Sequence, residues 1–180
     1  SNIGNIGSQN LCFEQAQGKW VLFVANDVRI HRGCIKALWE ALPIPNLGQL
    51  QPTLYTPEGN YDQCGMRWQW PGYGLSLKTI NRRPWKVISI VPSTCYLMQK
   101  SVWTHLGGFD ESFQSSHEDV DMGLRLAKVG YKNYVMIPLP EAQASGIHLG
   151  NATLQHTLSN HRQVFHQARL KVIRKHYRSW

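Results

Sequence analysis

The chain has 180 residues, of which 42% are apolar and 17% charged, a balance typical of a globular protein and not of a disordered one. Its net charge of +8 would suit a polyanion, a diphosphate or an anionic membrane surface, and charge alone does not choose among them. The chain has no apolar run of eighteen residues and no signal-peptide pattern, so we expect a soluble domain in the cytoplasm.

The four cysteines are widely spaced and lack a CxxC pair, which argues against a zinc cluster. We expect reduced, mostly buried thiols, as in a cytoplasmic protein. The residues are Cys12, Cys34, Cys64 and Cys95.

Two short helices are predicted in the first quarter of the chain. Residues 1–18 begin with Gly and Asn and then predict a helix whose buried side would comprise Leu11, Phe13 and Ala16. Residues 33–42 predict an amphipathic helix that ends before two prolines. Its inward side chains would be Ile35, Leu38, Trp39 and Leu42.

Between these helices, residues 20–25 (WVLFVA) predict a strand buried on both faces. Asn26 and Asp27 follow it directly. Open α/β sheets place ligand-binding groups at the carboxyl ends of their strands. For Asp27 alone, a simple turn residue is an equally good interpretation.

The middle of the chain predicts further strands over 47–55 and 87–99, with a turn or hairpin over 56–65 and a helix over 101–106. Residues 66–86 are less regular and rich in Gly, Pro, Trp and basic residues. Their aromatic rings could stack on sugars and their arginines could bind phosphate, or two or more of the tryptophans could fill the core. The residues singled out as acceptor or donor contacts are Trp68, Trp70, Arg82 and Arg83.

Acidic residues gather within 107–131, GGFDESFQSSHEDVDMGLRLAKVGY, ahead of an amphipathic helix pattern that stops at Gly130. Ser115 or Ser116 is the expected N-cap, with Glu118 or Asp119 at the third helical position. One interpretation is that these acids only cap and solubilise the helix.

The whole string favours a second interpretation. GGFDESF, HEDVD and GLRLAKVGY together resemble the closing motif of family 2 inverting glycosyltransferases with the GT-A fold, including rhamnosyltransferase-like bacterial members. The resemblance implies that Asp119 takes the proton from the acceptor hydroxyl, with Glu118 as its neighbour. A helix N-terminus lowers the pKa of a carboxylate, so burial and the adjacent acid would have to raise it.

The resemblance extends to the start of the chain, where Asn5, Gly7, Asn10 and VLFVANDV follow the family pattern. It implies that Asp27, with Asn26 beside it, lies at the site where a divalent cation holds the donor's diphosphate. Ala25 and Asn26 replace acidic positions of that motif, so one carboxylate remains. Mg²⁺ or Mn²⁺ can be held by one or two protein oxygens together with phosphates and water.

Two further segments fit the family. Ser93 and Thr94 stand where members have Gly-Ala at the floor of the sugar site, a change that would narrow the donor pocket. A strand is predicted over 131–138, and His148 follows where many members have a histidine that completes the metal or diphosphate site. A structural histidine is an equally good interpretation of His148.

The resemblance implies an α/β fold, a GT-A-like three-layer α/β/α sandwich with a mixed sheet. It covers only about the last two thirds of a typical catalytic domain, so we expect residues 1–180 to be a single partial domain that lacks the first strands. The sheet would then have an unpaired edge, which favours a homodimer or strand exchange.

The last segment, residues 156–180, predicts a basic helix from Asn160 onward. It could dock on the domain, lie on an acidic membrane surface or contact nucleic acid, and docking is the commonest outcome. Nucleic acid is disfavoured because the basic residues are dispersed and form no known binding motif. The apolar side would comprise Val164, Phe165, Ala168, Val172 and Ile173.

The resemblance implies an enzyme that moves a sugar from a nucleotide-diphosphate donor to a glycan or lipid-linked acceptor, with inversion, in polysaccharide biosynthesis. It would be a cytoplasmic bacterial protein, at the inner face of the membrane if its acceptor is a lipid. The alternative is a catalytically incomplete binding or assembly module that kept the fold.

Overall fold

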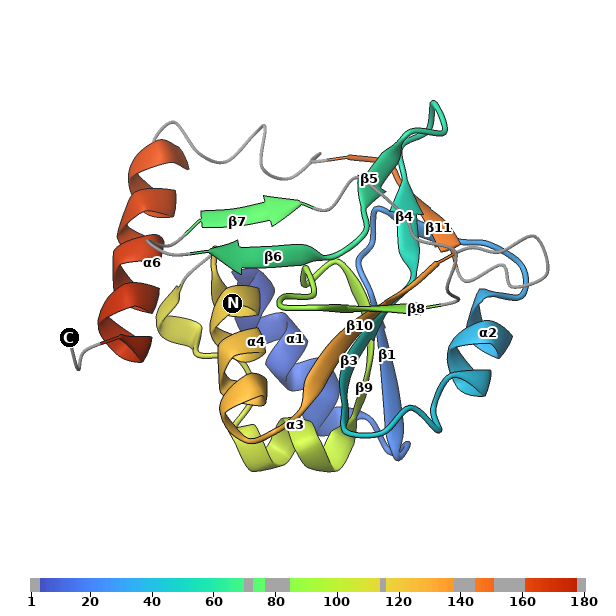
Figure 1. The fold of residues 1–180 in the computed structure, drawn as a ribbon, viewed down its shortest axis with the longest axis horizontal. Coiled ribbons are helices and arrows are strands. Elements are labelled where there is room, and N and C mark those ends of the chain that lie inside the picture. Colours follow the sequence, from blue (N-terminus) through green and yellow to red (C-terminus); the bar gives the residue numbers. More distant parts are fainter. Residues whose placement is uncertain are drawn as a thin grey trace.

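The computed structural model describes residues 4–69, 73–76, 85–113, 116–137, 145–150 and 161–177 (Figure 1). Three residues predicted to contact donor or acceptor lie outside the described residues. They are Trp70, Arg82 and Arg83. Within the described part of the chain, no helix is both long enough and apolar enough to cross a membrane.

The centre of the fold is a mixed five-stranded sheet in the order β1-β9-β3-β10-β8. β3 and β10 are parallel, and the other neighbours are antiparallel. Side chains alternate across it: on β9, Tyr96 and Met98 face one hydrophobic cluster and Leu97 faces the other. The strands are β1 (Trp20–Val24), β3 (Leu47–Gln51), β8 (Trp85–Ile88), β9 (Cys95–Gln99) and β10 (Lys132–Met136).

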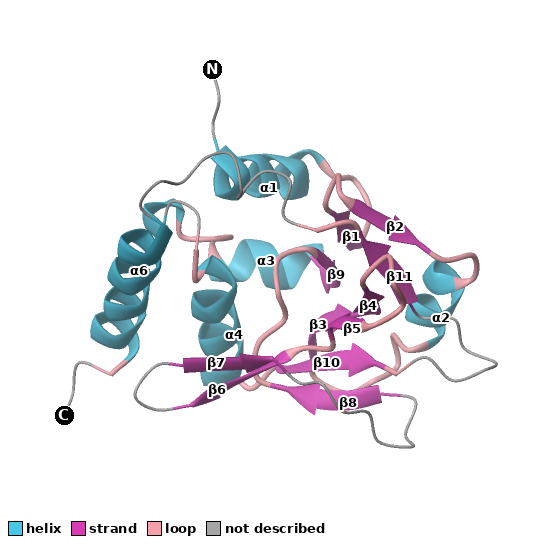
Figure 2. Cartoon of the chain, turned by 90° about the horizontal axis from the view of Figure 1, so that it is seen from above, coloured by secondary structure: helices cyan, strands magenta, loops and turns pink. Residues whose placement is uncertain are grey.

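Helices cover both faces of this sheet. α1 (Gly4–Gln15), α3 (Lys100–Leu106) and α4 (Glu118–Lys128) pack against one face, and α2 (Cys34–Glu40) packs against the other (Figures 1 and 2). Each helix contributes apolar side chains to the cluster on its own side of the sheet. The result is the predicted three-layer α/β/α arrangement.

Two smaller sheets lie beside the central one. The first has the order β2-β11-β4-β5, and the second is a hairpin of β6 and β7. Pro52, which cannot donate a backbone hydrogen bond, separates β3 from β4 within the single strand predicted over 47–55. The strands are β2 (Val28–Ile30), β4 (Thr53–Tyr55), β5 (Tyr61–Gln63), β6 (Met66–Gln69), β7 (Tyr73–Ser76) and β11 (Ser145–His148).

Several predictions of burial were wrong. β1 is only partly buried because it is the end strand of its sheet and, in the described part of the chain, pairs only with β9. In α1 and α2, Phe13 and Leu38 are buried as predicted. Each short helix covers the sheet with a narrow stripe, so other predicted inward side chains face solvent; they are Leu11, Ile35 and Trp39, exposed by 47%, 60% and 64%.

All four cysteines are free thiols, as predicted, and three of them are buried. Burial raises the pKa of Cys34 and Cys64 to about 11. These thiols therefore stay protonated at neutral pH and act as small apolar side chains.

Asn10 of α1 joins two motifs that lie far apart in the sequence. Its Nδ2 donates to the Phe109 carbonyl at 3.0 Å, and its Oδ1 accepts from the Phe109 amide at 2.9 Å. Phe109 belongs to the GGFDE segment, so the amide of Asn10 acts as a clamp that fixes this segment against α1.

Replacing Asn10 by alanine is expected to reduce the free energy of unfolding by about 1–3 kcal/mol, because two backbone groups of Phe109 lose their partner. Chemical denaturation of the two proteins measures the change. The matched control is Gln15→Ala, which removes a side-chain amide from the exposed end of α1. Asn46→Ala is unsuitable because Asn46 has a φ of 54°, a left-handed conformation that alanine disfavours. Equal stability of Asn10→Ala and Gln15→Ala would contradict this role.

The basic C-terminal helix, α6 (His161–His176), docks on the domain, the commonest of the three predicted outcomes. Ala168 and Val172 are buried against the larger cluster. Lys175 Nζ and His176 Nε2 each lie 2.8 Å from Oδ1 of Asp121 on α4. Asp121 is fully buried, and although burial opposes its charge, hydrogen bonds from His176 and Lys175 hold its pKa below the usual value.

Candidate active site

The predicted acidic pair opens helix α4. The helix begins at Glu118, and the N-cap residue is His117 in the left-handed region with a φ of 68°. The prediction that Ser116 is the N-cap is therefore wrong, and Ser115 lies outside the described residues. Ser116 Oγ instead lies 2.7 Å from Nδ1 of His117, so the serine hydroxyl orients this histidine.

Glu118 is buried, with 4% of its surface exposed. Its Oε1 accepts a hydrogen bond of 2.7 Å from Ser93 Oγ, while Oε2 has no hydrogen-bond partner in the described part of the chain. Burial raises the pKa of this carboxyl, and the Ser93 hydroxyl partly offsets the rise.

Asp119 is partly exposed, and its Oδ1 accepts from the Val120 amide at 2.8 Å. Burial and the neighbouring Glu118 raise its pKa to about 8, against the lowering effect of hydrogen bonds from the backbone amides of Val120 and Ser93. The upward tuning that a general base requires, which the helix N-terminus alone would oppose, is thus present.

The Ser93–Thr94 turn connects this acidic pair to the end of β1. The Thr94 carbonyl accepts from the Ala25 amide at 2.8 Å, directly before Asn26 and Asp27. The side-chain Oγ1 of Thr94 accepts from Gln63 Nε2 at 3.1 Å. The Ser93–Thr94 turn therefore contacts both the acidic pair and the segment that carries Asp27. This one turn links the two predicted halves of the site.

His148 and Asp27, predicted to share a cation, lie together. His148 Nε2 is 3.3 Å from Asp27 Oδ2, because β11 pairs antiparallel with β2 and the Leu149 amide donates to the Asp27 carbonyl at 2.8 Å. The other ring nitrogen, Nδ1, is 2.6 Å from Asp62 Oδ2 on β5. Asn26 is exposed in the turn between β1 and β2.

A carboxylate oxygen and an imidazole nitrogen that lie this close fit a divalent cation such as Mn²⁺. Asp62 contacts the far nitrogen of the His148 ring, a partner that fixes the tautomer and orientation of a metal-binding histidine. The described residues hold no group of three or more His, Cys, Asp or Glu that could bind an ion alone. A two-residue site would leave coordination positions for the phosphates of a donor.

Replacing Asp62 by alanine is expected to raise the Mn²⁺ concentration required for half-maximal activity about 10- to 100-fold, because the His148 ring loses its orienting partner. A Mn²⁺ titration of initial rates measures the effect. Glu58→Ala, a fully exposed acid in the β4–β5 turn, is the matched control. A lower melting temperature with unchanged Mn²⁺ dependence would show that Asp62 is only structural.

Trp68 is the one predicted sugar-contact residue that the structure describes. It is partly buried beside the larger cluster, and its Nε1 donates to Tyr177 Oη at 3.0 Å. Its ring lies edge-on to His117, with centroids 6.4 Å apart. Trp68 thus adjoins the start of α4, and its contact with sugar remains a prediction.

Comparison with known proteins assigns a family to this arrangement. The family described as "Glycosyl transferase family 2" matches residues 1–106. The chain belongs to this family. The match includes α1, β1, Asp27 in the turn that follows it, and the Ser93–Thr94 turn.

Two bacterial relatives of this family 2 chain are longer than the chain itself. It is 29% identical over 138 residues to the O-antigen biosynthesis protein RfbC of Myxococcus xanthus, covering 68% of this chain and 11% of the relative. It is 26% identical over 168 residues to an N-acetylglucosaminyl-diphospho-decaprenol L-rhamnosyltransferase of Mycobacterium tuberculosis, covering 81% and 53%. The chain thus spans about half, or less, of the length of these relatives.

Among solved structures, the family 2 chain is similar to GalNAc-T7, crystallised with UDP, GalNAc and Mn²⁺. The TM-score is 0.71 at 10% identity, and the match covers 94% of this chain and 34% of the other. The likeness concerns the fold, and it confirms the predicted α/β GT-A-like fold.

Proposed function

We propose that this protein transfers a sugar from a nucleotide-diphosphate donor to a hydroxyl group of a glycan or lipid-linked acceptor, with inversion at the anomeric carbon. The observation that carries the proposal is Asp119, a carboxyl of raised pKa at the start of α4, held next to the turn that also contacts the Asp27 segment. Membership of glycosyl transferase family 2 supports it.

In the proposed reaction the acceptor hydroxyl attacks the anomeric carbon as the bond to the donor diphosphate breaks. Asp119 accepts the proton that the hydroxyl loses. Glu118, whose charge is unfavourable in its buried position, raises the basicity of Asp119 and is fixed by Ser93. Since Asp119 is partly exposed and Glu118 is not, only Asp119 is placed to meet an acceptor.

Asp27 and His148 would hold Mg²⁺ or Mn²⁺, with Asp62 orienting His148 and Asn26 at the adjoining turn. When bound, the ion neutralises charge that develops on the leaving diphosphate. The observed pairing of Asp27 with His148 is the support for this assignment.

The acceptor we propose is a sugar carried on a polyprenyl diphosphate, by analogy with the name of the mycobacterial relative. Such a substrate would bring the protein to the cytoplasmic face of a bacterial membrane, where the basic helix α6 could also contact anionic lipid. The partly exposed edge of β1 could pair with a second copy of the chain, giving a homodimer.

The direct test is transfer from a panel of nucleotide sugars to polyprenyl-diphosphate-linked acceptors in the presence of Mn²⁺. We expect one donor to yield a product of inverted anomeric configuration. Retention of configuration would contradict the single-displacement scheme. Donor binding in a calorimetric titration without any transfer would instead support the binding-module alternative.

A further inference from the structure

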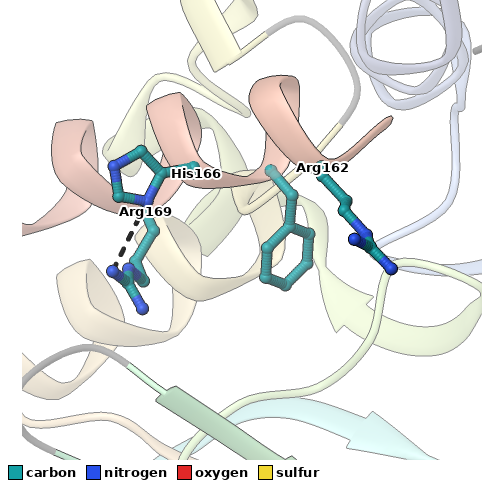
Figure 3. A pocket seen from close by; sticks show the side chains of 4 residues that line it. Arg162, His166 and Arg169 are labelled. Atoms are coloured by element: carbon teal, nitrogen blue, oxygen red, sulfur yellow. Dashed lines mark hydrogen bonds between the residues drawn. The ribbon is translucent and has the colours of Figure 1, made fainter. Parts of the chain in front are cut away.

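One face of α6 carries a row of cationic and aromatic side chains: Arg162, Phe165, His166 and Arg169. They are spaced at i, i+3, i+4 and i+7 and therefore lie along the same side of the helix. Together they line a hollow of about 290 Å³ (Figure 3). Arg169 Nη2 lies 3.5 Å from Nδ1 of His166 within this row.

One residue that lines the hollow, Phe165, contacts the residue directly before the acidic pair. The Phe165 ring meets the His117 ring edge-on, with centroids 4.4 Å apart, and His117 directly precedes Glu118 and Asp119 in the chain. Burial, with a further contribution from the charge of Arg169, lowers the pKa of His117 to about 4. His117 is therefore neutral at pH 7, and Arg162 and Arg169 set the charge of the hollow.

Other cations of α6 have a different role. Lys171 contacts Ser112, and Lys175 lies 2.8 Å from both Asp110 and Asp121. These contacts attach the helix to α4 and to the turn of 3₁₀-helix at Glu111–Phe113. α6 contains no acidic residue, so the charged side chains that this helix contributes to the hollow are basic.

Two arginines on one face suit a phosphate ligand, since each guanidinium can donate two parallel hydrogen bonds to phosphate oxygens. The volume is near the lower limit of small-molecule sites, which suits a head group better than a whole glycan. Phe165 is 49% exposed and offers an apolar surface beside the arginines. A diphosphate followed by an apolar chain matches these features together.

We propose that this hollow binds the diphosphate of the lipid-linked acceptor, with the first isoprene units against Phe165 and the acceptor sugar directed toward Asp119. The inference rests on the proposed function for its choice of ligand. The donor diphosphate, by contrast, is assigned to Asp27 and His148, so the two diphosphates have separate sites.

The first experiment measures binding alone. Farnesyl diphosphate is titrated by calorimetry into the protein in EDTA, which removes any contribution from a cation at Asp27. We expect the double variant Arg162→Gln/Arg169→Gln to raise Kd about tenfold or more. The control, Lys128→Gln/Arg174→Gln, removes the same charge from exposed positions and should leave Kd unchanged.

If the control variant loses as much affinity for farnesyl diphosphate as the double variant, the binding is general charge attraction and the proposal is overturned. The same conclusion follows if both variants also lose affinity for phosphatidylglycerol vesicles to an equal extent. If the double variant has a lowered melting temperature, Arg162→Gln alone is used, because Arg162 is exposed. An unchanged Kd for a folded Arg162→Gln variant would equally overturn it.

The second experiment uses transfer kinetics. We expect the double variant to raise KM for a polyprenyl-diphosphate-linked acceptor about tenfold, with unchanged KM for the donor and unchanged rates on an octyl glycoside that lacks phosphate. Equal losses on both acceptors would contradict the diphosphate assignment. Absence of transfer by the wild-type protein would contradict the proposed function. The Kd values for farnesyl diphosphate from the first experiment would still support or overturn the proposed diphosphate site.

Discussion

Asp119→Asn is expected to lower kcat about 100- to 10,000-fold, the usual contribution of a positioned general base. Asparagine fills the same volume and can still accept from the Val120 amide, but it cannot take a proton. The measurement is the initial rate with donor and acceptor saturating. In the wild-type protein, kcat/KM should rise with pH through about 8, because Asp119 must be deprotonated to act.

The same variant supplies its own control for folding. The pKa of Asp119 is raised in the folded protein from 3.8 to about 8, so between these values the folded state holds a proton that the unfolded state has released. Stability contributed by the neutral carboxyl is therefore full below pH 4 and is lost as pH rises toward 8.

Asparagine is neutral throughout this range. We therefore expect the melting temperature of Asp119→Asn to match the wild type near pH 4 and to exceed it at pH 8. Lost activity with raised stability would exclude misfolding as the cause. Wild-type activity in Asp119→Asn would contradict the assignment of the base. Glu40→Gln, which removes an acid at the exposed end of α2, is the control and should leave activity unchanged.

Asp27→Ala is expected to lower kcat/KM at least about 100-fold and to abolish stimulation by Mn²⁺, since it removes the only carboxylate that contacts His148 Nε2 in the described part of the chain. The measurements are a Mn²⁺ titration of the rate and calorimetric binding of Mn²⁺ with a nucleoside diphosphate. Asp62 remains in this variant and keeps the His148 ring in place.

Two further variants separate the roles at this site. His148→Ala should weaken Mn²⁺ binding as Asp27→Ala does, whereas Glu58→Ala should leave it unchanged because Glu58 is fully exposed in the turn between β4 and β5. Full activity of the wild-type protein in EDTA would contradict a role for the cation.

The resemblance to family 2 glycosyltransferases was sufficient to predict the fold class and to name Asp27 and His148 together, and the structure places these two side chains 3.3 Å apart. Their binding of a cation stays a prediction. Hydrophobic patterning by itself located strands, such as the one at WVLFVA. Helical periodicity was less informative about burial. It shows which residues share a face, but Trp39 is exposed because the neighbouring sheet covers only the stripe formed by Cys34, Ala37 and Leu38.

Two other contacts between distant segments could not be predicted. Asp62 lies in what the sequence describes only as a turn or hairpin, and its contact with His148 exists because β4 pairs with both β5 and β11. The hydrogen bond from Ser93 to Glu118 likewise depends on how the turn before β9 meets α4. No local pattern in the sequence signals either contact.

Asp121 links the predicted chemistry of α4 to the helix that covers it. It lies two residues after Asp119; its buried charge is balanced by Arg125 and Lys175, and His176 Nε2 lies 2.8 Å from its Oδ1. Loss of its two α6 partners, Lys175 and His176, would leave that carboxylate buried and under-compensated. We therefore expect a related chain that lacks Asp121 to lack these α6 partners as well, since each of them is present to satisfy the same buried carboxylate.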